Sequence, residues 1–200
     1  MELPVRYRTE VADRKRLTAH DWTAAAVAAL ARGGIAAVAV EPIAASLGTT
    51  KGSFYWHFGN RDALLEAALL EWERTDTDDV IALVETEPDL HRRLRTLLAV
   101  ALGGGAGRPG ERVELALQPT AGHPLVAPVL ARVTARRLGY LADLFSALGF
   151  PPDEARQRSL LAYTAYLGHA QLAHATPAAT PTGEELSSYV DTVIATLTTR

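Results

Sequence analysis

The sequence contains no cysteine among its 200 residues. It can therefore form no disulfide framework, no thiolate zinc site and no cysteine nucleophile. No apolar run approaches the roughly 18 residues needed to span a membrane, and no apolar signal region opens the chain. Sustained alternation of apolar and polar residues, which is typical of strands, is also missing. These absences predict an all-α, cytoplasmic protein with no membrane partner.

Recognisable catalytic and metal-binding patterns are missing as well. Neither G-x-S-x-G nor H-E-x-x-H occurs, and the five-residue spacing of His169 and His174 places them on different faces of a helix. The glycine run at residues 103–107 has no strand before it and no Lys-Ser after it, so it predicts a flexible connector rather than a phosphate loop. We therefore expect a protein that is not an enzyme and that uses no metal and no cofactor.

Charge is unevenly distributed, although the net charge is only −3. Residues 1–60 carry a net charge of +2, and residues 61–200 a net charge of −5. The small total argues against a general binder of polyanions. The cluster Arg14-Lys15-Arg16 nevertheless suits an N-terminal arm that lies along DNA phosphates. For residues 1–12 we favour a solvated, disordered tail.

The most informative stretch is EPIAASLGTTKGSFYWHFGNR, residues 41–61. A first short helix has an apolar stripe formed by Ile43, Ala44 and Leu47. Gly48 follows where a helix ends in a left-handed residue, a conformation that glycine adopts at low cost. Thr50 is then a suitable N-cap, because its hydroxyl can accept a hydrogen bond from an unpaired N–H of the next helix. The pattern is that of a helix-turn-helix.

The second short helix sorts its side chains by angle. At about 100° per residue, Phe54 and Phe58 point together toward the first helix, whereas Gly52 and Trp56 point away from it. The outer face suits a DNA groove, since lysine and hydroxyl groups bind phosphate and aromatic edges contact thymine methyl groups and sugars. Gly52 leaves room for the backbone to approach the duplex. The alternative is that this aromatic-rich helix belongs to the core.

At these residues the chain resembles the tetracycline-repressor (TetR) family of bacterial transcription regulators. The resemblance extends from Trp22 to Leu70. It rests on the alanine-rich helix Trp22–Ala31, on Gly34-Ile35, Ile43-Ala44 and Leu47-Gly48, and above all on KGSFYWHF (51–58) followed by RDALL (61–65). In two departures, Ala39 replaces the usual Ser or Thr N-cap and Pro42 occupies the first turn of that helix. Proline is tolerated there, and the missing cap costs about 1 kcal/mol.

The resemblance implies an all-α fold with two domains. An N-terminal arm and a three-helix DNA-binding domain with a helix-turn-helix are placed at residues 1–60. A helical ligand-binding and dimerisation domain is placed at residues 61–200, with a fourth helix at 61–74 as the connection. Matched to the motif, the predicted DNA-binding residues are Thr50, Lys51, Gly52, Ser53, Tyr55, Trp56, His57 and Arg61.

Local signals predict where other helices begin and change. Capping boxes are expected at Thr18–Asp21 and Thr182–Glu185, and Asn60 is expected to cap the fourth helix. The polar stretch Thr75–Asp79 is expected to break or bend that helix. Apolar residues at helical spacing continue to the end of the chain.

A homodimer is expected, because one helix-turn-helix makes too few contacts to select a genomic site. Two recognition helices about 34–36 Å apart, or a multiple of that, would match a palindromic double-stranded operator. The last two long helices form the expected four-helix interface, through Leu160, Tyr163, Leu167, Ala170, Gln171, Tyr189, Val193 and Leu197. The alternative is that these stripes are only intramolecular core.

The resemblance also implies a ligand cavity among the middle helices. Polar or aromatic residues on otherwise apolar faces are the candidates for its lining. They are Glu114, Gln118, His123, Tyr140, Phe145, Tyr163 and Tyr166, with Arg137 and His169 also available. Because the surrounding helices are rich in Leu, Val and Ala, the expected small-molecule effector is largely hydrophobic or aromatic.

The sequence thus predicts a sequence-specific, DNA-binding transcriptional regulator, in this family most often a repressor that its ligand releases. The ligand would favour a state whose helix spacing mismatches the operator, with the fourth helix as the lever. The alternatives are a helical protein-interaction module and a small helical enzyme. Salt dependence separates a DNA contact, which weakens steeply with salt through counterion release, from an aromatic protein contact.

Overall fold

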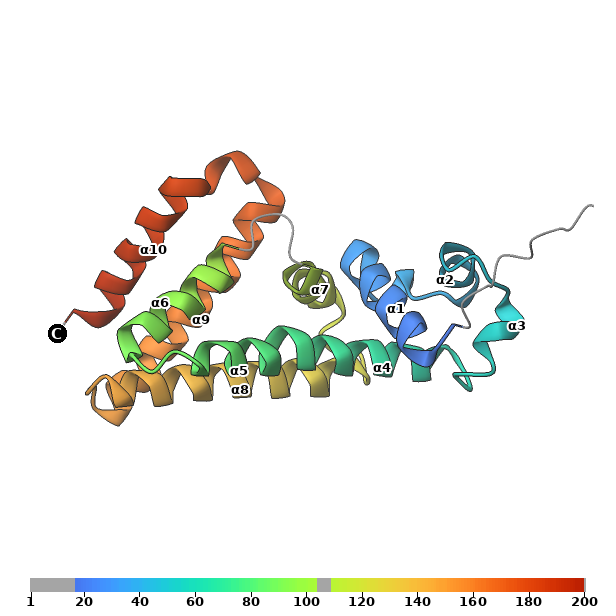
Figure 1. The fold of residues 1–200 in the computed structure, drawn as a ribbon, viewed down its shortest axis with the longest axis horizontal. Helices are drawn as coiled ribbons and strands as arrows, with labels where there is room; N and C mark the ends of the chain where they lie inside the picture. The colour runs from blue at the N-terminus through green and yellow to red at the C-terminus, as the bar shows by residue number, and fades with distance from the viewer. Residues whose placement is uncertain (1–16, 104–108, 200) are drawn as a thin grey trace, which may run out of the picture.

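A computed structural model describes residues 17–103 and 109–199, and over those ranges the chain consists of helices and turns. The predicted all-α class is confirmed. The proposed basic arm at Arg14-Lys15-Arg16, the tail before it and most of the glycine run lie outside the described residues. Figure 1 shows an elongated molecule, with α1, α2 and α3 at one end and α10 toward the other.

The first end of the molecule holds four short elements. They are α1 (Ala19–Gly33), the 3₁₀ turn η1 (Gly34–Ala37), α2 (Val40–Ser46) and α3 (Lys51–Phe54). The predicted capping box opens α1: the Asp21 amide donates to the Thr18 hydroxyl (3.3 Å), and the Asp21 carboxylate accepts from the Thr18 amide (2.7 Å). Ala39 precedes α2 without a side-chain cap, as predicted.

The turn between α2 and α3 is built as predicted at its glycine but not at its cap. Gly48 has φ +64°, the left-handed conformation expected there. The Thr50 side chain makes no capping hydrogen bond, so that prediction is wrong. The backbone carbonyl of Thr50 instead accepts a hydrogen bond from the Ser53 amide at 3.0 Å. This is the amide that a capping hydroxyl would have bound.

The remaining elements form the body of the molecule. They are α4 (Arg61–Glu73), the π turn η2 (Arg74–Asp78), α5 (Asp79–Glu85), α6 (Leu90–Leu102), α7 (Pro109–Leu117), η4 (Gln118–Thr120), α8 (Val126–Ala147), α9 (Pro152–Ala175), η5 (Pro177–Ala179) and α10 (Gly183–Thr198). Asn60 caps α4 as predicted, accepting from the Ala63 amide at 2.8 Å. Thr182 provides no side-chain cap, because Gly183 at the first helical position has φ +56°.

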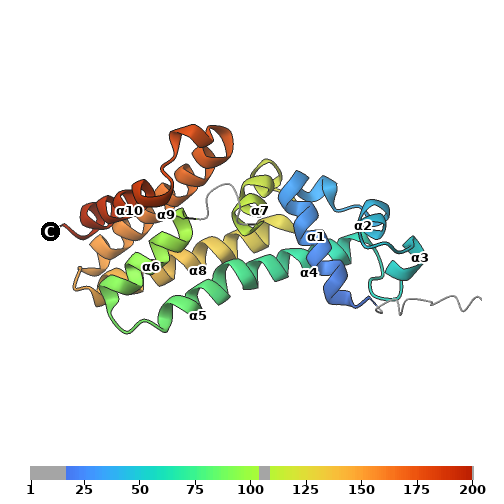
Figure 2. The same ribbon diagram turned by 45° about the horizontal axis from the view of Figure 1, so that its top comes forward.

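One long rod connects the two ends. The polar stretch predicted to break or bend the fourth helix forms the π turn η2, and the helix continues into α5. Figures 1 and 2 show this rod running beside α8 along the long axis. Arg132 of α8 binds Glu73 through two hydrogen bonds (2.5 and 2.9 Å), and Arg136 pairs with Asp78 at 3.7 Å. None of the helices in the described ranges is long and apolar enough to cross a bilayer.

Buried apolar side chains form two main clusters. The first joins α1, α2, α3 and α4 to α7 and the start of α8, and it includes Trp22, Trp72, Val113 and Leu117. The second joins α6, α8, α9 and α10. Since α7 belongs to the first cluster, packing is continuous across the predicted domain boundary after residue 60. The division at that residue remains a prediction.

Candidate nucleic-acid interface and ligand cavity

The inward face of the helix-turn-helix is an aromatic cluster. Phe54 is fully buried, with its ring 5.4 Å from Trp22 in an edge arrangement and 5.7 Å from Phe58 in a stacked one. These contacts fix the rotation of α3, because two rings on one side of a short helix leave the opposite side facing outward. The inward direction predicted for Phe54 and Phe58 agrees with this packing.

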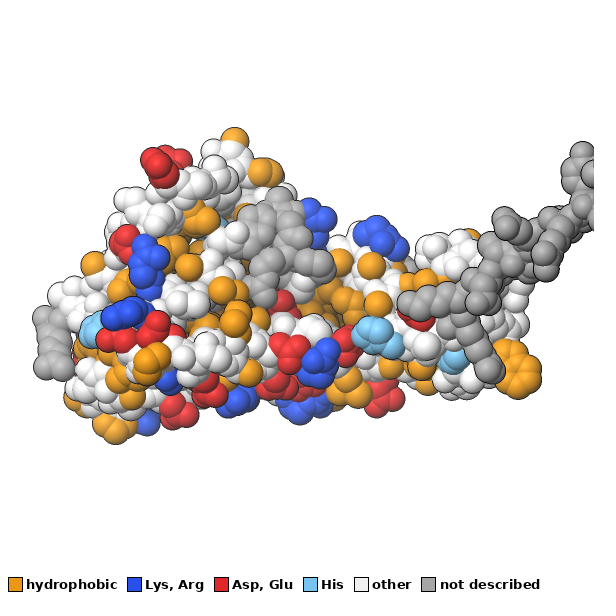
Figure 3. All heavy atoms as spheres, viewed as in Figure 1, with side chains coloured by type: hydrophobic (Ala, Val, Ile, Leu, Met, Phe, Trp, Pro, Cys, Tyr) orange, Lys and Arg blue, Asp and Glu red, His pale blue; other side chains and the backbone are white. Residues whose placement is uncertain are grey.

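The outward face carries large aromatic side chains that the described residues leave exposed. Tyr55 is 57% exposed and Trp56 is 87% exposed. Figure 3 shows hydrophobic atoms protruding at the α3 end of the molecule. Among the described residues, a Cβ on Gly52 would meet only the Thr50 hydroxyl, at 3.6 Å, and Ser53 and His57 lie beside Trp56. A contiguous patch of exposed apolar surface is typical of an interaction site rather than of ordinary surface.

Lys51 lies at the edge of this face in an exposed ion pair. Its ammonium is 3.0 Å from Glu41 of α2, and the hydrogen bond to that carboxylate raises the pKa of Lys51 above its ordinary value. Exposed pairs of this kind contribute little free energy, so a phosphate can take the place of Glu41 at small cost. Thr50, with no cap bond to make, has an exposed hydroxyl on the same side.

Arg61 has a different position from the other predicted DNA-binding residues. Its Nε donates to the Val38 carbonyl at 2.7 Å, and its Nη2 donates to the Ile35 carbonyl. Ile35 lies in η1 and Val38 directly follows it, so Arg61 ties the start of α4 to the segment that leads into the helix-turn-helix. A positioning role for Arg61 fits these contacts better than direct contact with DNA.

A cavity of about 80 Å³ opens between η2, α5, α6, α8 and α9. Eight apolar side chains from α5, α6, α8 and α9 make up most of its wall. Three of the predicted ligand-binding residues line it, namely Tyr140, Tyr163 and Tyr166. The Tyr140 hydroxyl is buried and makes no hydrogen bond of good geometry among the described residues. Burial raises the pKa of Tyr140, and the nearby Arg93 opposes that rise.

Three other predicted residues do not line this cavity. Gln118 lies on the exposed turn η4, and His123 accepts a hydrogen bond from the Leu125 amide (3.2 Å) in the following loop. Phe145 is fully buried in the second cluster, with its ring 6.1 Å from Phe150. These three departures share one cause, because residue type shows that a side chain is apolar or polar but not which neighbours it meets.

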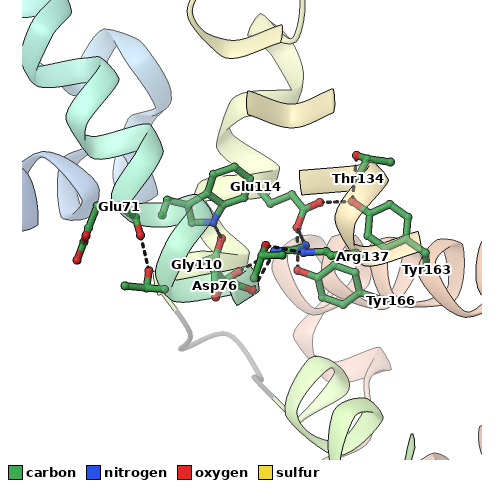
Figure 4. Close-up of polar contacts among 11 residues, drawn as sticks. Glu71, Asp76, Gly110, Glu114, Thr134, Arg137, Tyr163 and Tyr166 are labelled. Carbon is green, nitrogen blue, oxygen red and sulfur yellow. Dashed lines mark hydrogen bonds and ion pairs between the residues drawn. The ribbon is translucent and has the colours of Figure 1, made fainter. Parts of the chain in front are cut away.

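Glu114 lies directly behind the cavity wall in a cluster of hydrogen bonds (Figure 4). Its side chain is 3% exposed, and three donors converge on its carboxylate. Tyr163 donates to Oε1 at 2.8 Å, Tyr166 donates to Oε2 at 2.9 Å, and Arg137 Nη1 donates to Oε2 at 2.6 Å. The carboxylate comes from α7, whereas the donors come from α8 and α9.

Arg137 joins this carboxylate to the π turn. Its Nε donates to the Thr77 hydroxyl at 3.0 Å, and its Nη2 lies 3.2 Å from both the carbonyl and the carboxylate of Asp76. The guanidinium also lies 5.9 Å from the centre of the Trp72 ring and 5.7 Å from that of Tyr166. Every nitrogen of Arg137 is therefore engaged, and the cluster spans η2, α7, α8 and α9.

Burial and charge set the protonation of this cluster. Burial alone would lower the pKa of Arg137, but the facing Glu114 carboxylate raises it above its ordinary value. Burial, with the Glu114 charge, raises the pKa of Tyr163 to about 12 and raises that of Tyr166 further. Both tyrosines therefore stay protonated near neutral pH and act as hydrogen-bond donors.

Sequence reasoning misses Asp76 and Thr77 as parts of the site. Both lie in the polar stretch that we interpret from the sequence as a break or bend in the helix. That interpretation gives no reason to expect side chains of this stretch at a cavity. The available signal is a cluster of polar residues in the middle of a strongly apolar helical pattern. Such an interruption is typical of a π turn, which often marks a functional site.

Comparisons with known proteins agree with this arrangement. Residues 23–68 match the profile described as bacterial regulatory proteins, tetR family. No curated protein matches the sequence. A transcriptional regulator from Rhodococcus sp. RHA1 is 23% identical with a TM-score of 0.74, and the match covers 90% of this chain and 96% of the other.

Two further solved structures share the fold. AibR, crystallised with isovaleryl coenzyme A and operator DNA, is 18% identical with a TM-score of 0.65, over 89% of this chain and 96% of its own. The fatty acid degradation regulator FadR from Bacillus halodurans is 19% identical with a TM-score of 0.66, over 90% of this chain and 93% of its own. At these identities the likeness concerns the fold.

Proposed function

Residues 23–68 match the tetR family of bacterial regulatory proteins, and from this premise we propose that the chain is a DNA-binding transcriptional regulator of that family acting in the cytoplasm. The observation that carries the proposal is the exposed Tyr55–Trp56 face beside Lys51 on a helix-turn-helix whose core is fully buried. Its role is regulatory rather than enzymatic, and repression of transcription is the simplest form of that role.

The proposed DNA contact uses α3 in the major groove. Trp56 lies on the outermost part of the face and is assigned to base edges, while Lys51, Thr50, Ser53 and Tyr55 are assigned mainly to phosphates. Gly52 lets the backbone approach the duplex, and His57 lies at the margin of the face. Arg61 acts indirectly by fixing α4 to the helix-turn-helix.

The proposed assembly is a homodimer on a palindromic operator. Leu160, Leu161 and Leu172 of α9 are each more than half exposed in the isolated chain. These leucines lie along one side of a long helix, which suits a helix-packed interface between two copies. Tyr163, Ala170 and Leu197, which the sequence also suggested for this interface, are buried within the chain and belong to its own core.

The proposed effector is a small molecule with a largely apolar body, bound in the cavity beside η2. AibR, a fold relative, was crystallised with both isovaleryl coenzyme A and operator DNA, which supports a regulator that binds both kinds of partner. Ligand and operator would oppose each other reciprocally, with a coupling free energy of about 1–3 kcal/mol.

Titration of the purified chain against DNA fragments from its own upstream region tests the proposal. We expect binding whose log K falls with log salt with a slope steeper than about −3, because several phosphates are neutralised. Trp56→Ala should reduce this binding. The matched control is Leu83→Ala, since Leu83 is also a large exposed apolar residue (57% exposed) but lies on α5. Binding to no fragment, or binding that salt does not weaken, would count against a DNA regulator and favour a protein-interaction module.

A further inference from the structure

The three donors around Glu114 form a carboxylate-binding site that faces the cavity. Arg137, Tyr163 and Tyr166 all line the cavity, whereas Glu114 is not part of its wall. Glu114 reaches these donors from α7 and occupies the place where an anionic head group from the cavity would bind. The protein's own side chain thus fills a site that a ligand can approach from the other side.

Charge makes the two occupants mutually exclusive. The cluster contains one guanidinium and two carboxylates, Asp76 and Glu114, so its formal charge is −1. A second carboxylate brought in while Glu114 remains would raise this to −2 at a buried position, which is costly. The two tyrosines cannot serve both carboxylates, because each has a single O–H and Glu114 already accepts it.

We propose that the effector is an apolar molecule that ends in a carboxylate, and that it binds by displacing Glu114 from Arg137, Tyr163 and Tyr166. The apolar body lies against the leucine, valine and isoleucine side chains of α5 and α6. A cationic head would have to take one of the two carboxylates away from Arg137, to which both are already bound, and it would leave Glu114 in its place. An uncharged head would leave the ion pairs in place and exert no force on α7.

Movement of α7 would transmit the displacement of Glu114 to the DNA-binding end of the molecule. On the same helix, Val113 and Leu117 pack in the first apolar cluster, and the Ala116 carbonyl lies against Gly34 of η1. The carbonyl of Gly110 accepts from the Trp72 indole of α4 at 2.9 Å. A displaced Glu114 is a buried charge without partners, so α7 must move to bring it to water. Only this last link, from α7 to DNA, rests on the proposed function.

Isothermal titration of the full chain without DNA tests the ligand class with three probes of equal chain length: octanoate, octylamine and 1-octanol. We expect octanoate to bind and the other two to give no heat of binding. In a parallel operator titration, octanoate should weaken DNA binding and octylamine should not. Preference for octylamine or 1-octanol, or no binding of any of the three, overturns the proposal.

Variants of Glu114 separate displacement from a merely structural role. E114Q keeps the size of the side chain but removes its charge, so we expect octanoate to bind about tenfold more tightly. E114D should tighten binding less, and it serves if E114Q does not fold. The matched control is E73Q, which breaks the Glu73–Arg132 pair between the rod and α8, away from the cavity lining, and should leave octanoate affinity unchanged.

The possible results separate the displacement of Glu114 from the proposal that the protein is a DNA-binding regulator. Octanoate affinity that E114Q and E114D leave unchanged or weaken, or that E73Q changes equally, overturns displacement of Glu114. Operator binding measured without octanoate tests the regulator proposal alone. Octanoate binding without any operator binding would keep the carboxylate site and refute the regulator, and the reverse result would refute only the site.

Discussion

Gly34→Ala and Gly48→Ala form a matched pair that measures how tightly α7 is held against the DNA-binding end. Both glycines have positive φ, +61° and +64°, which an alanine adopts only with strain. A Cβ on Gly48 would meet no atom within 4 Å. A Cβ on Gly34 would lie 2.7 Å from the Ala116 carbonyl oxygen, and a backbone atom cannot turn aside as the end of a side chain can.

The expected losses of stability follow from these contacts. Gly48→Ala should lower the free energy of unfolding by about 1–2 kcal/mol, the cost of a left-handed alanine. Gly34→Ala has backbone strain of about 1–3 kcal/mol, and it must also push η1 away from α7. We therefore expect Gly34→Ala to cost at least about 1 kcal/mol more than Gly48→Ala, or roughly 2–4 °C in melting temperature for a chain of this size.

Urea unfolding followed by tryptophan fluorescence measures the difference, since Trp22 and Trp72 are fully buried and report on the first cluster. The slope of free energy against urea should match between the variants, so that the midpoints compare directly. Equal losses for the two variants would refute the reasoning, because the close approach of Gly34 to Ala116 would then carry no energy.

Three other predictions concern separate parts of the molecule. Trp56→Ala should change stability by less than about 0.5 kcal/mol because the ring is 87% exposed, yet it should relax base preference in binding to mutated operators, whereas Lys51→Ala should weaken binding to all sequences about equally. Leu161→Glu should convert the dimer to a monomer in light scattering, because it places a charge in an apolar seam, and a persisting dimer would locate the interface elsewhere. Burial lowers the pKa of His169, which stacks on Tyr189, so the unfolded chain protonates first as pH falls. Stability should therefore be full above about pH 6.5 and decline below it, and His169→Phe should remove that decline in urea titrations, whereas an unchanged decline would place its origin at another group.

The features that sequence predicts here depend on neighbours close in the chain. The Thr18–Asp21 box, the left-handed Gly48 and the shared direction of Phe54 and Phe58 each involve residues within four positions of one another. Local chemistry is enough to decide them, because backbone angles and helix periodicity fix the relative placement of such residues. The family resemblance at residues 22–70 then added the expected order of domains, which no local rule supplies.

The features that sequence misses depend on distant neighbours. The sequence singles out Glu114, Tyr163 and Tyr166 as separate candidates, but it does not show that α8 and α9 bring the tyrosines and Arg137 to the Glu114 carboxylate. Leu197 has the periodicity of an interface residue, but α6 and α9 cover it within the same chain. Arg61 matches a DNA-binding motif, yet two carbonyls more than twenty residues away occupy its guanidinium. Helical periodicity identifies which face of a helix is apolar, but it does not identify the residues that pack against that face.

The π turn adds one residue to the rod formed by α4, η2 and α5. A regular α-helix would bury the same side of the rod without that residue. Trp72 and Thr77 are buried five positions apart, and the four-residue step resumes from Thr77 to Ile81. Deleting one residue within 74–78 would let a regular α-helix bury the same stripe while shortening the rod by about 1.5 Å. Such a deletion would remove the widened turn, in which the Asp76 carbonyl accepts a hydrogen bond from Arg137. The polar end of the cavity thus depends on one extra residue that the helix itself does not need in order to continue.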